Sequence, residues 1–316
     1  MSVACARQNA GFSLVELMIS MVLGLILIGG ILTMYLSSKR TMHTTEASSQ
    51  IQETARLALD RIGFDVRMSG FWGCQSQAGL LISALNASAT WLDLAATSIA
   101  GSDNDGPAGS DSVTLVLANQ DPVELLAPMS SASSALSVSP TSGLVEGDVV
   151  VVNDCDSVDA FQVDGSSPHI SGALLHDAGG AMVPGNVRST LSKAYDQGAE
   201  IYRIEQVTWS LGQDTDGTPA LLRNGTVYVR GVENLQVSFG VDSNGDNSTD
   251  TYVDADDIVS WSQVLNIKLG LLIRSEREVV DQTPAPISFW GQTMTPSDGY
   301  MRRAFSAVVS IRNRVS

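Results

Sequence analysis

Four oxygen-bearing side chains share one short segment in the C-terminal half, and they are Asp242, Asn244, Asp246 and Asp250. The alternation of the first three is typical of the start of a calcium-binding loop, in which carboxylate and amide oxygens bind the ion. The rest of the segment fits less well, because Asn247 stands where such a loop needs glycine and Val253 where it needs a bidentate glutamate. We therefore expect either an irregular calcium site or a solvated hairpin tip.

Other side chains that could support catalysis are few. The histidines His43, His169 and His176 have no cysteine or carboxylate at metal-binding spacing, so we interpret them as helix-surface and loop residues. The chain also has no G-x-S-x-G elbow, no Walker phosphate loop and no H-E-x-x-H zinc motif. We expect a protein that is not an enzyme and acts by contact.

The three cysteines are Cys5, Cys74 and Cys155. Cys5 precedes a long apolar segment, in a stretch that processing would remove. Cys74 and Cys155 would then remain to form a disulfide, closing a loop of about 80 residues and stabilising the fold by roughly 4 kcal/mol in an oxidising compartment. The alternative is that both are unpaired, buried thiols.

One carboxylate, Glu16, interrupts an otherwise apolar run from Gly11 to Leu36. As a helix, Phe12 to Leu36 would span about 37 Å, enough to cross a hydrocarbon core of about 30 Å. The short, acid-free stretch before Gly11 favours a cytoplasmic N-terminus. A carboxylate in hydrocarbon is costly unless it is paired with a cation or reaches the headgroups.

The elements that must position these residues follow from periodicity. Apolar residues recur at helical spacing beyond the span, at Ile51, Ala55, Leu59, Ile62 and Val66. We expect one helix from Phe12 to Ser69, whose first half (12–36) crosses a membrane and whose second half (37–69) packs its apolar stripe on a globular domain (70–316).

Short apolar runs separated by turn residues predict strands in the rest of the chain. The expected strands are Ser112–Ala118, Asp148–Asn153, Ala220–Arg223, Thr226–Arg230, Val232–Val241, Val264–Arg274 and Ala304–Arg312. Asn224-Gly225 predicts a tight hairpin, and Ala127–Ser142 reads as an exposed loop. The predicted fold class is α+β, with an antiparallel sheet packed against the outer half of the helix.

The charge balance excludes one class of partner. Lys and Arg number 18 against 34 Asp and Glu, a formal charge of −16, so a nucleic acid would be repelled. Only 16% of residues are charged, which suits an extracytoplasmic, strand-rich domain.

The string Gly11-Phe12-Ser13-Leu14-Val15-Glu16 before an apolar run resembles the class III signal of type IV prepilins and type II secretion pseudopilins. The resemblance implies that residues 1–11 are a leader, that a prepilin peptidase cuts after Gly11, and that Phe12 is N-methylated. It also implies that Glu16 pairs with the terminal amine of a neighbouring subunit and sets the assembly register. The alternative for Glu16 is a carboxylate that snorkels to the headgroups.

Several downstream stretches resemble the PilW family of minor pilins, and they are 69–74 (SGFWGC), 154–155 (DC), 232–236 (VENLQ) and 271–275 (LLIRS). This resemblance implies a minor pilin that primes type IV pilus assembly and helps to display an adhesin at the tip. The implied partners are major and minor pilins, the prepilin peptidase, an inner-membrane assembly platform and a tip adhesin. The chain would reside in the bacterial inner membrane as a single-pass protein before assembly and at the cell surface afterwards.

Two alternatives stay open. A minor pseudopilin of a type II secretion system would carry the same N-terminal signal. A membrane-tethered, calcium-dependent binding module or enzyme would use residues 1–36 as a plain anchor.

Overall fold

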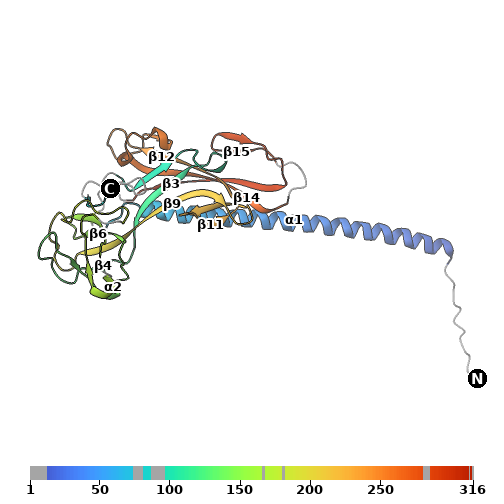
Figure 1. Cartoon of the computed structure of the whole chain (residues 1–316). Helices are drawn as coiled ribbons and strands as arrows, with labels where there is room; N and C mark the ends of the chain where they lie inside the picture. Colours follow the sequence, from blue (N-terminus) through green and yellow to red (C-terminus); the bar gives the residue numbers. More distant parts are fainter. Residues whose placement is uncertain are drawn as a thin grey trace, which may run out of the picture.

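The protein consists of one long helix and a globular part built mainly of strands (Figure 1). The computed structural model describes residues 13–73, 81–86, 97–165, 168–179, 182–279, 285–312 and 314. Its α-helices are α1 (Leu14–Met68) and α2 (Pro168–Ser171). Its strands are β1 (Leu81–Ser83), β2 (Ile99–Ser102), β3 (Ser112–Ala118), β4 (Val123–Glu124), β5 (Leu136–Ser137), β6 (Val149–Asn153), β7 (Val158–Gln162), β8 (Ala173–Leu174), β9 (Glu200–Gln213), β10 (Pro219–Arg223), β11 (Thr226–Arg230), β12 (Val232–Val241), β13 (Thr251–Val253), β14 (Val264–Glu278), β15 (Ile287–Phe289), β16 (Gln292–Met294) and β17 (Tyr300–Ser310).

Helix α1 ends where the backbone changes direction. Ser69 is extended, and Gly70 has a φ of 73°, a conformation that L side chains rarely adopt. A Cβ at Gly70 would also lie 2.8 Å from the Ser98 hydroxyl. The predicted end of the helix near Ser69 is therefore confirmed, whereas its predicted start, Phe12, lies outside the described residues.

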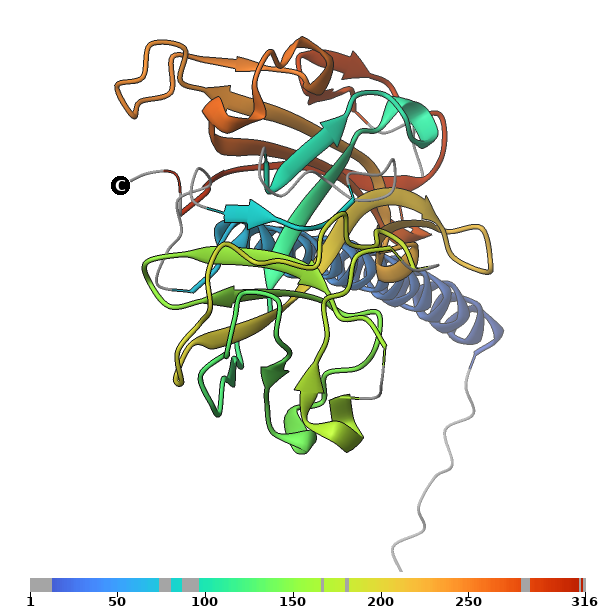
Figure 2. The same ribbon diagram turned by 60° about the vertical axis from the view of Figure 1, so that its left-hand side comes forward.

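The larger sheet is organised around β9, which pairs antiparallel with β3, β4, β6 and β10. The order runs β1-β7-β6-β9-β10-β11, with β2 joined through β3. Strand β9 is long enough to serve two lobes. Its first residues pair with β4 and β6 in one lobe, and its later residues pair with β3 and β10 beside α1 (Figure 2).

The smaller sheet has the antiparallel order β13-β12-β14-β17, and α1 packs against β14 and β17. The buried face of α1 presents small and branched side chains, and these are Ala47, Ile51, Ala55, Ala58, Ile62 and Val66. All of them except Ala47 share one hydrophobic core with alternate residues of β14, among them Leu269 and Leu271. The outer half of the helix is thus held by burial, as its apolar stripe predicts.

A second core fills the other lobe. Its buried residues include Leu125, Leu136, Phe161, Leu174 and Ile201. The expectation that Ala127–Ser142 is a plain exposed loop is wrong in part, because Leu136 and Val138 are buried there and β5 pairs with β8. Apolar residues isolated among Ser and Pro have no period, so the sequence pattern did not reveal this core.

The predicted α+β fold class is confirmed. Strand Ser112–Ala118 is found with those bounds as β3, and the Asn224-Gly225 hairpin joins β10 to β11. The predicted strands at 148–153, 232–241, 264–274 and 304–312 correspond to β6, β12, β14 and β17. Strands β7 and β9 were missed.

Candidate assembly surface

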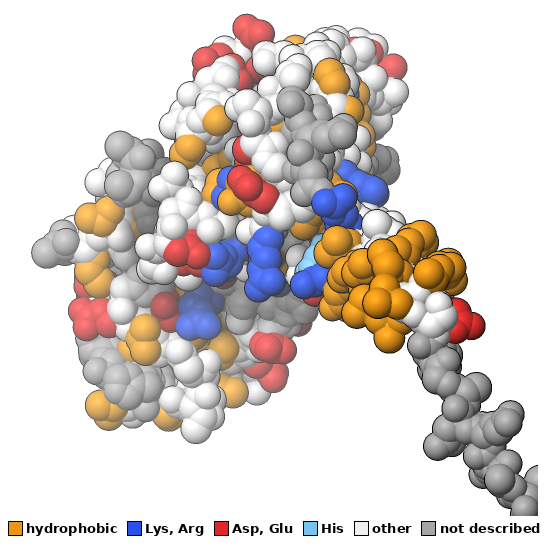
Figure 3. Space-filling view, turned by 90° about the vertical axis from the view of Figure 1, so that its right-hand side faces the viewer, with side chains coloured by type: hydrophobic (Ala, Val, Ile, Leu, Met, Phe, Trp, Pro, Cys, Tyr) orange, Lys and Arg blue, Asp and Glu red, His pale blue; other side chains and the backbone are white. Residues whose placement is uncertain are grey.

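The first half of α1 stands clear of the globular part (Figure 1). Every large hydrophobic side chain between Leu14 and Leu36 is exposed. The most apolar window of the helix has a mean hydropathy of 2.5 and no buried residue. Figure 3, viewed from the helix side, shows this stretch as a continuous hydrophobic surface projecting from a mixed polar one. By length and composition, the segment can cross a membrane or pack against other helices.

Glu16 lies in the first turn of α1. Its Oε2 accepts a hydrogen bond from the Ser13 N–H at 3.0 Å, while the Ser13 hydroxyl accepts one from the Val15 N–H at 3.3 Å. Together they form a capping box, which satisfies N–H groups that the helix leaves without an internal partner. The Glu16 carboxylate is thereby held at the start of the helix, four residues along the sequence from Phe12.

Gly11 and Phe12, the predicted cleavage and methylation residues, lie outside the described residues. The exposed segment contains three glycines, Gly24, Gly29 and Gly30. A Cβ atom added to any of them would have no neighbouring atom within 4 Å. Their surfaces are open for close approach by another helix.

An exposed stretch separates the apolar segment from the domain. The first buried helix residue is Ala47, about 16 Å along the axis from Leu36. The intervening stretch contains Lys39 and Arg40, and His43 lies 3.9 Å from Glu46. The globular part is therefore set back from the end of the apolar segment.

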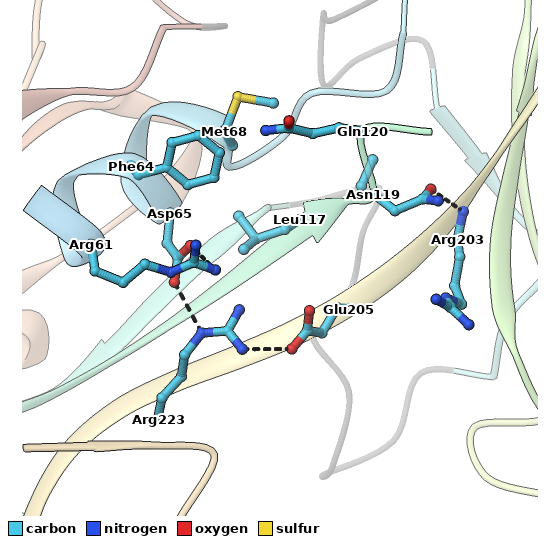
Figure 4. A pocket seen from close by; sticks show the side chains of 11 residues that line it. Arg61, Phe64, Asp65, Met68, Leu117, Asn119, Gln120, Arg203, Glu205 and Arg223 are labelled. Atoms are coloured by element: carbon cyan, nitrogen blue, oxygen red, sulfur yellow. Dashed lines mark hydrogen bonds and ion pairs between the residues drawn. The ribbon is translucent and has the colours of Figure 1, made fainter. Parts of the chain in front are cut away.

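The other end of α1 is fastened by a buried carboxylate, Asp65 (Figure 4). Its Oδ2 accepts hydrogen bonds from Trp209 Nε1 at 3.0 Å and from Arg223 Nε at 3.2 Å. Its Oδ1 lies 3.2 Å from Arg61 Nη2. Arg223 also binds Glu205 at 2.9 Å. These contacts tie the last turns of α1 to β9 and β10.

Burial raises the pKa of Asp65, although Arg61 and Arg223 oppose the shift. The loss of hydration therefore outweighs the attraction of two guanidinium groups. The network borders an open cavity of about 340 Å³ between α1, β3 and β9, which Asn119 and Arg203 also line. Because Asp65, Arg61, Arg223 and Glu205 pair with one another, the cluster serves to position the helix.

The Asp242 loop is closed by its own hydrogen bonds. The Asp242 carboxylate accepts from the backbone N–H groups of Asn244, Gly245 and Asn247 at 3.2, 2.7 and 2.9 Å. Although desolvation acts in the opposite direction, these donors lower the pKa of Asp242. Asp250 accepts from the side chains of Ser243 and Asn244.

Within the described ranges, no group of three or more His, Cys, Asp or Glu side chains is arranged to hold a metal ion. Asp246 accepts a hydrogen bond from the Ser248 N–H at 2.8 Å and so takes part in the local turn. Calcium binding at Asp242, Asn244, Asp246 and Asp250 stays a prediction.

Cys155 is disulfide-bonded, and Cys74 lies outside the described residues, so the proposed Cys74–Cys155 pairing stays a prediction. His176 lies in a loop, as predicted, but it is buried: a ring nitrogen lies 3.1 Å from the Ser134 carbonyl oxygen, and the ring packs against Phe161. The side chain of His169 lies outside the described set.

The sequence interpretation missed the Asp65 network. A signal was present, since Asp65 falls three residues after Ile62 and seven after Ala58, on the face that carries the apolar stripe. A charged residue at a core position predicts a buried partner. Trp209 could not be assigned to it, because β9 was not predicted. Arg223 lies in the predicted strand Ala220–Arg223, but the place of that strand beside α1 was not predicted.

Two family models match the chain. The model of the prokaryotic N-terminal methylation motif matches residues 6–32, which include the Gly11–Glu16 string. The model of type IV pilus-assembly protein W (PilW) matches residues 203–313, which run from β9 through the four-stranded sheet. The chain therefore matches the PilW family over its C-terminal third and carries a type IV prepilin signal.

The two matches cover separate parts of this chain and leave one lobe unmatched. They cover the exposed half of α1 and the sheet that packs on its outer half, whereas the lobe containing Leu125, Leu136 and Phe161 lies outside both. No curated protein and no solved structure matches the chain. The PilW family is a structural component of pilus assembly, so this chain is a pilus-related subunit that interacts with other pilus components.

Proposed function

We propose that this PilW-family chain is a minor pilin that enters the inner membrane, is cleaved after Gly11, is methylated at Phe12, and primes type IV pilus assembly through contacts of α1. One observation carries the proposal. A prepilin methylation motif coincides with the exposed, apolar first half of α1, while the second half of the same helix packs on the sheet that the PilW model matches.

The position of Glu16 gives the proposal its mechanism. In the uncleaved chain, Glu16 accepts the N–H of Ser13, a neutral donor. Cleavage after Gly11 would place a positive amine on Phe12, next to this cap. An amine from a neighbouring helix would neutralise a carboxylate that is costly in hydrocarbon. Pairing would then be available only when two helices align, which sets the axial register.

The set-back of the domain supports assembly through the helix. The stretch between Leu36 and Ala47 is exposed and lengthens α1 by about 16 Å before the globular part begins. Neighbouring helices can therefore approach the apolar segment without meeting the domain. A low-copy position near the filament tip and display of an adhesin belong to the same proposal, by analogy with the family.

The test compares Glu16→Ala with Glu46→Ala, which removes an exposed glutamate beyond the apolar segment. Each variant replaces the native gene, and membrane level, N-terminal cleavage and incorporation into sheared pili are measured. We expect Glu16→Ala to be inserted and cleaved normally but incorporated about tenfold less, the effect of losing roughly 1.4 kcal/mol of pairing, whereas Glu46→Ala behaves as wild type. Normal incorporation of Glu16→Ala would refute the register mechanism.

A further inference from the structure

Strand β17 forms one edge of the four-stranded sheet. In the described part of the chain it pairs only with β14, in one unbroken register from Asn266↔Ser310 to Arg274↔Arg302. It is 11 residues long. The opposite side of this strand therefore carries backbone groups that no described strand pairs with.

The register identifies which groups these are. The Ile311 N–H donates to the Leu265 carbonyl at 2.9 Å, so odd-numbered residues of β17 point their N–H groups toward β14. Met301 agrees, since its N–H donates to the Ser275 hydroxyl on the same side. The even-numbered residues point theirs outward, and they are Ala304, Ser306, Val308 and Ser310.

The side chains of these same four residues are exposed, and that of Val308 is 57% exposed. Helix α1 packs on the opposite face of β17. Gly63 of the helix is so close to the strand that a Cβ atom added to it would lie 3.5 Å from the Val309 side chain. Helix α1 therefore does not cover the outer edge. Strand β15 lies close to β17 but pairs with β16 and forms no ladder with β17.

Edge strands normally carry a feature that prevents pairing with another chain, such as a charge, a proline, a bulge or a short length. The other three strands that end these two sheets follow this rule: β11 pairs with β10 across a bulge and carries Arg230, and β1 and β13 are each three residues long. From Ala304 to Ile311, β17 has no charge, no proline and no bulge. The charged side chains of β17 are Arg302, which pairs with Glu233 and Asp298, and the exposed Arg303. The exposed Arg312 follows the strand.

The direction of β17 restricts what can pair with it. The end of β14 lies beside His43 and Gln50 of α1, and the start of β17 pairs with this end of β14. The end of β17 lies beside Gly63, so β17 runs in the same direction as the helix. An antiparallel partner must run toward the start of α1. If two subunits share a membrane with their helices parallel, antiparallel pairing of β17 with a second β17 is excluded, because it would reverse one helix.

In the described part of the chain, the other edge of the four-stranded sheet does not match β17. It is β13, which runs toward the start of the helix and spans only Thr251–Val253. It cannot fill an edge of about eight residues. The complementary strand must come from a different subunit and, to complement Arg303 and Arg312, carry acidic residues near its ends.

We propose that the outer edge of β17 binds an extended strand of a second, different pilin-type subunit, which adds antiparallel to the four-stranded sheet and runs toward the membrane. The proposal rests on the proposed function for the shared membrane and parallel helices. Affinity comes from main-chain hydrogen bonds at Ala304, Ser306, Val308 and Ser310, and specificity comes from small side chains and basic ends.

The test uses Ser306→Pro in the full chain, expressed from its native locus. Proline at position 306 removes an outward N–H and places its ring against an added strand, but it removes no hydrogen bond to β14. Ser306→Thr is the matched control, because it keeps the N–H and favours a strand. Ser306→Lys is a second blocking variant that needs no change of backbone. Each chain carries p-benzoylphenylalanine in place of Val308, and crosslinked peptides are identified by mass spectrometry.

We expect a crosslink to a predicted strand of another protein that itself carries a prepilin signal. Its yield should fall at least about tenfold in Ser306→Pro and Ser306→Lys, and stay unchanged in Ser306→Thr. A crosslink to a second copy of this chain or to a protein without a prepilin signal, a yield that does not depend on residue 306, or the absence of any crosslink would overturn the proposal.

The N-terminal peptide is measured in the same samples. A mature terminus at Phe12 without the crosslink would refute the β17 proposal and leave the proposed function intact. An unprocessed terminus would refute the proposed function itself, whatever the crosslink shows.

Discussion

Replacing Asp65 tests how the long helix is fastened to the globular part. Asp65→Ala removes the acceptor of the buried Trp209 N–H and the partner of Arg61 and Arg223. An unpaired buried donor costs about 1–3 kcal/mol, and breaking a buried ion pair costs about 3–5 kcal/mol. The lower part of this range applies, because Arg223 keeps Glu205 and Arg61 is 38% exposed. We expect Asp65→Ala to lower the free energy of unfolding by about 3–4 kcal/mol.

Asp65→Asn should be much milder. Burial raises the pKa of Asp65, so the folded protein already penalises the charged form, and an amide keeps an oxygen for Trp209. We expect a loss of about 1 kcal/mol. The assay is urea unfolding of the full chain in detergent micelles, followed by near-UV circular dichroism. An alanine variant that loses less than 1 kcal/mol, or an asparagine variant as damaged as alanine, would refute the reasoning.

Two further predictions concern stability. Burial raises the pKa of Asp111 to about 6, and the nearby carboxylate of Asp103 acts in the same direction. The hydrogen bonds from the Asn104 and Val237 N–H groups oppose this shift. The folded chain therefore holds this proton more tightly than the unfolded chain, and the contribution of Asp111 to stability is greatest below about pH 4 and is lost as the pH rises to about 6, a change of up to about 3 kcal/mol. Urea unfolding at a series of pH values should show this loss in the wild type, and a similar loss in Asp111→Asn would count against it. Cys155→Ser should lower the free energy of unfolding by about 2–5 kcal/mol, and reducing the wild-type chain should have the same effect. If reductant lowered the free energy of unfolding of Cys155→Ser still further, a disulfide that does not involve Cys155 would be responsible.

The sequence predicted the elements whose patterns are local. The Asn224-Gly225 hairpin, β3 and the outer half of α1 each rest on a turn dipeptide, a β-branched run or a 3.6-residue period. The Gly11–Glu16 string predicted the prepilin class, since it combines a short motif with a long apolar helix.

The parts that were missed depend on contacts between distant residues. The second core gathers Leu136, Phe161 and Ile201 from segments without a shared period. Asp65 meets Trp209 and Arg223 across more than 140 residues of chain. The outer edge of β17 is defined by which strands lie beside it, and the order β13-β12-β14-β17 is not encoded in any single strand.

The central claim is that the chain is processed and assembled as a prepilin. The most direct test is intact mass and N-terminal peptide mass spectrometry on protein from its native membrane, with and without reduction. The account predicts a mature chain that begins at N-methylated Phe12 and contains a Cys74–Cys155 linkage. An intact Met1, or cleavage at another site, would leave Glu16 without a partner amine and would contradict assembly through α1 in favour of a tethered domain.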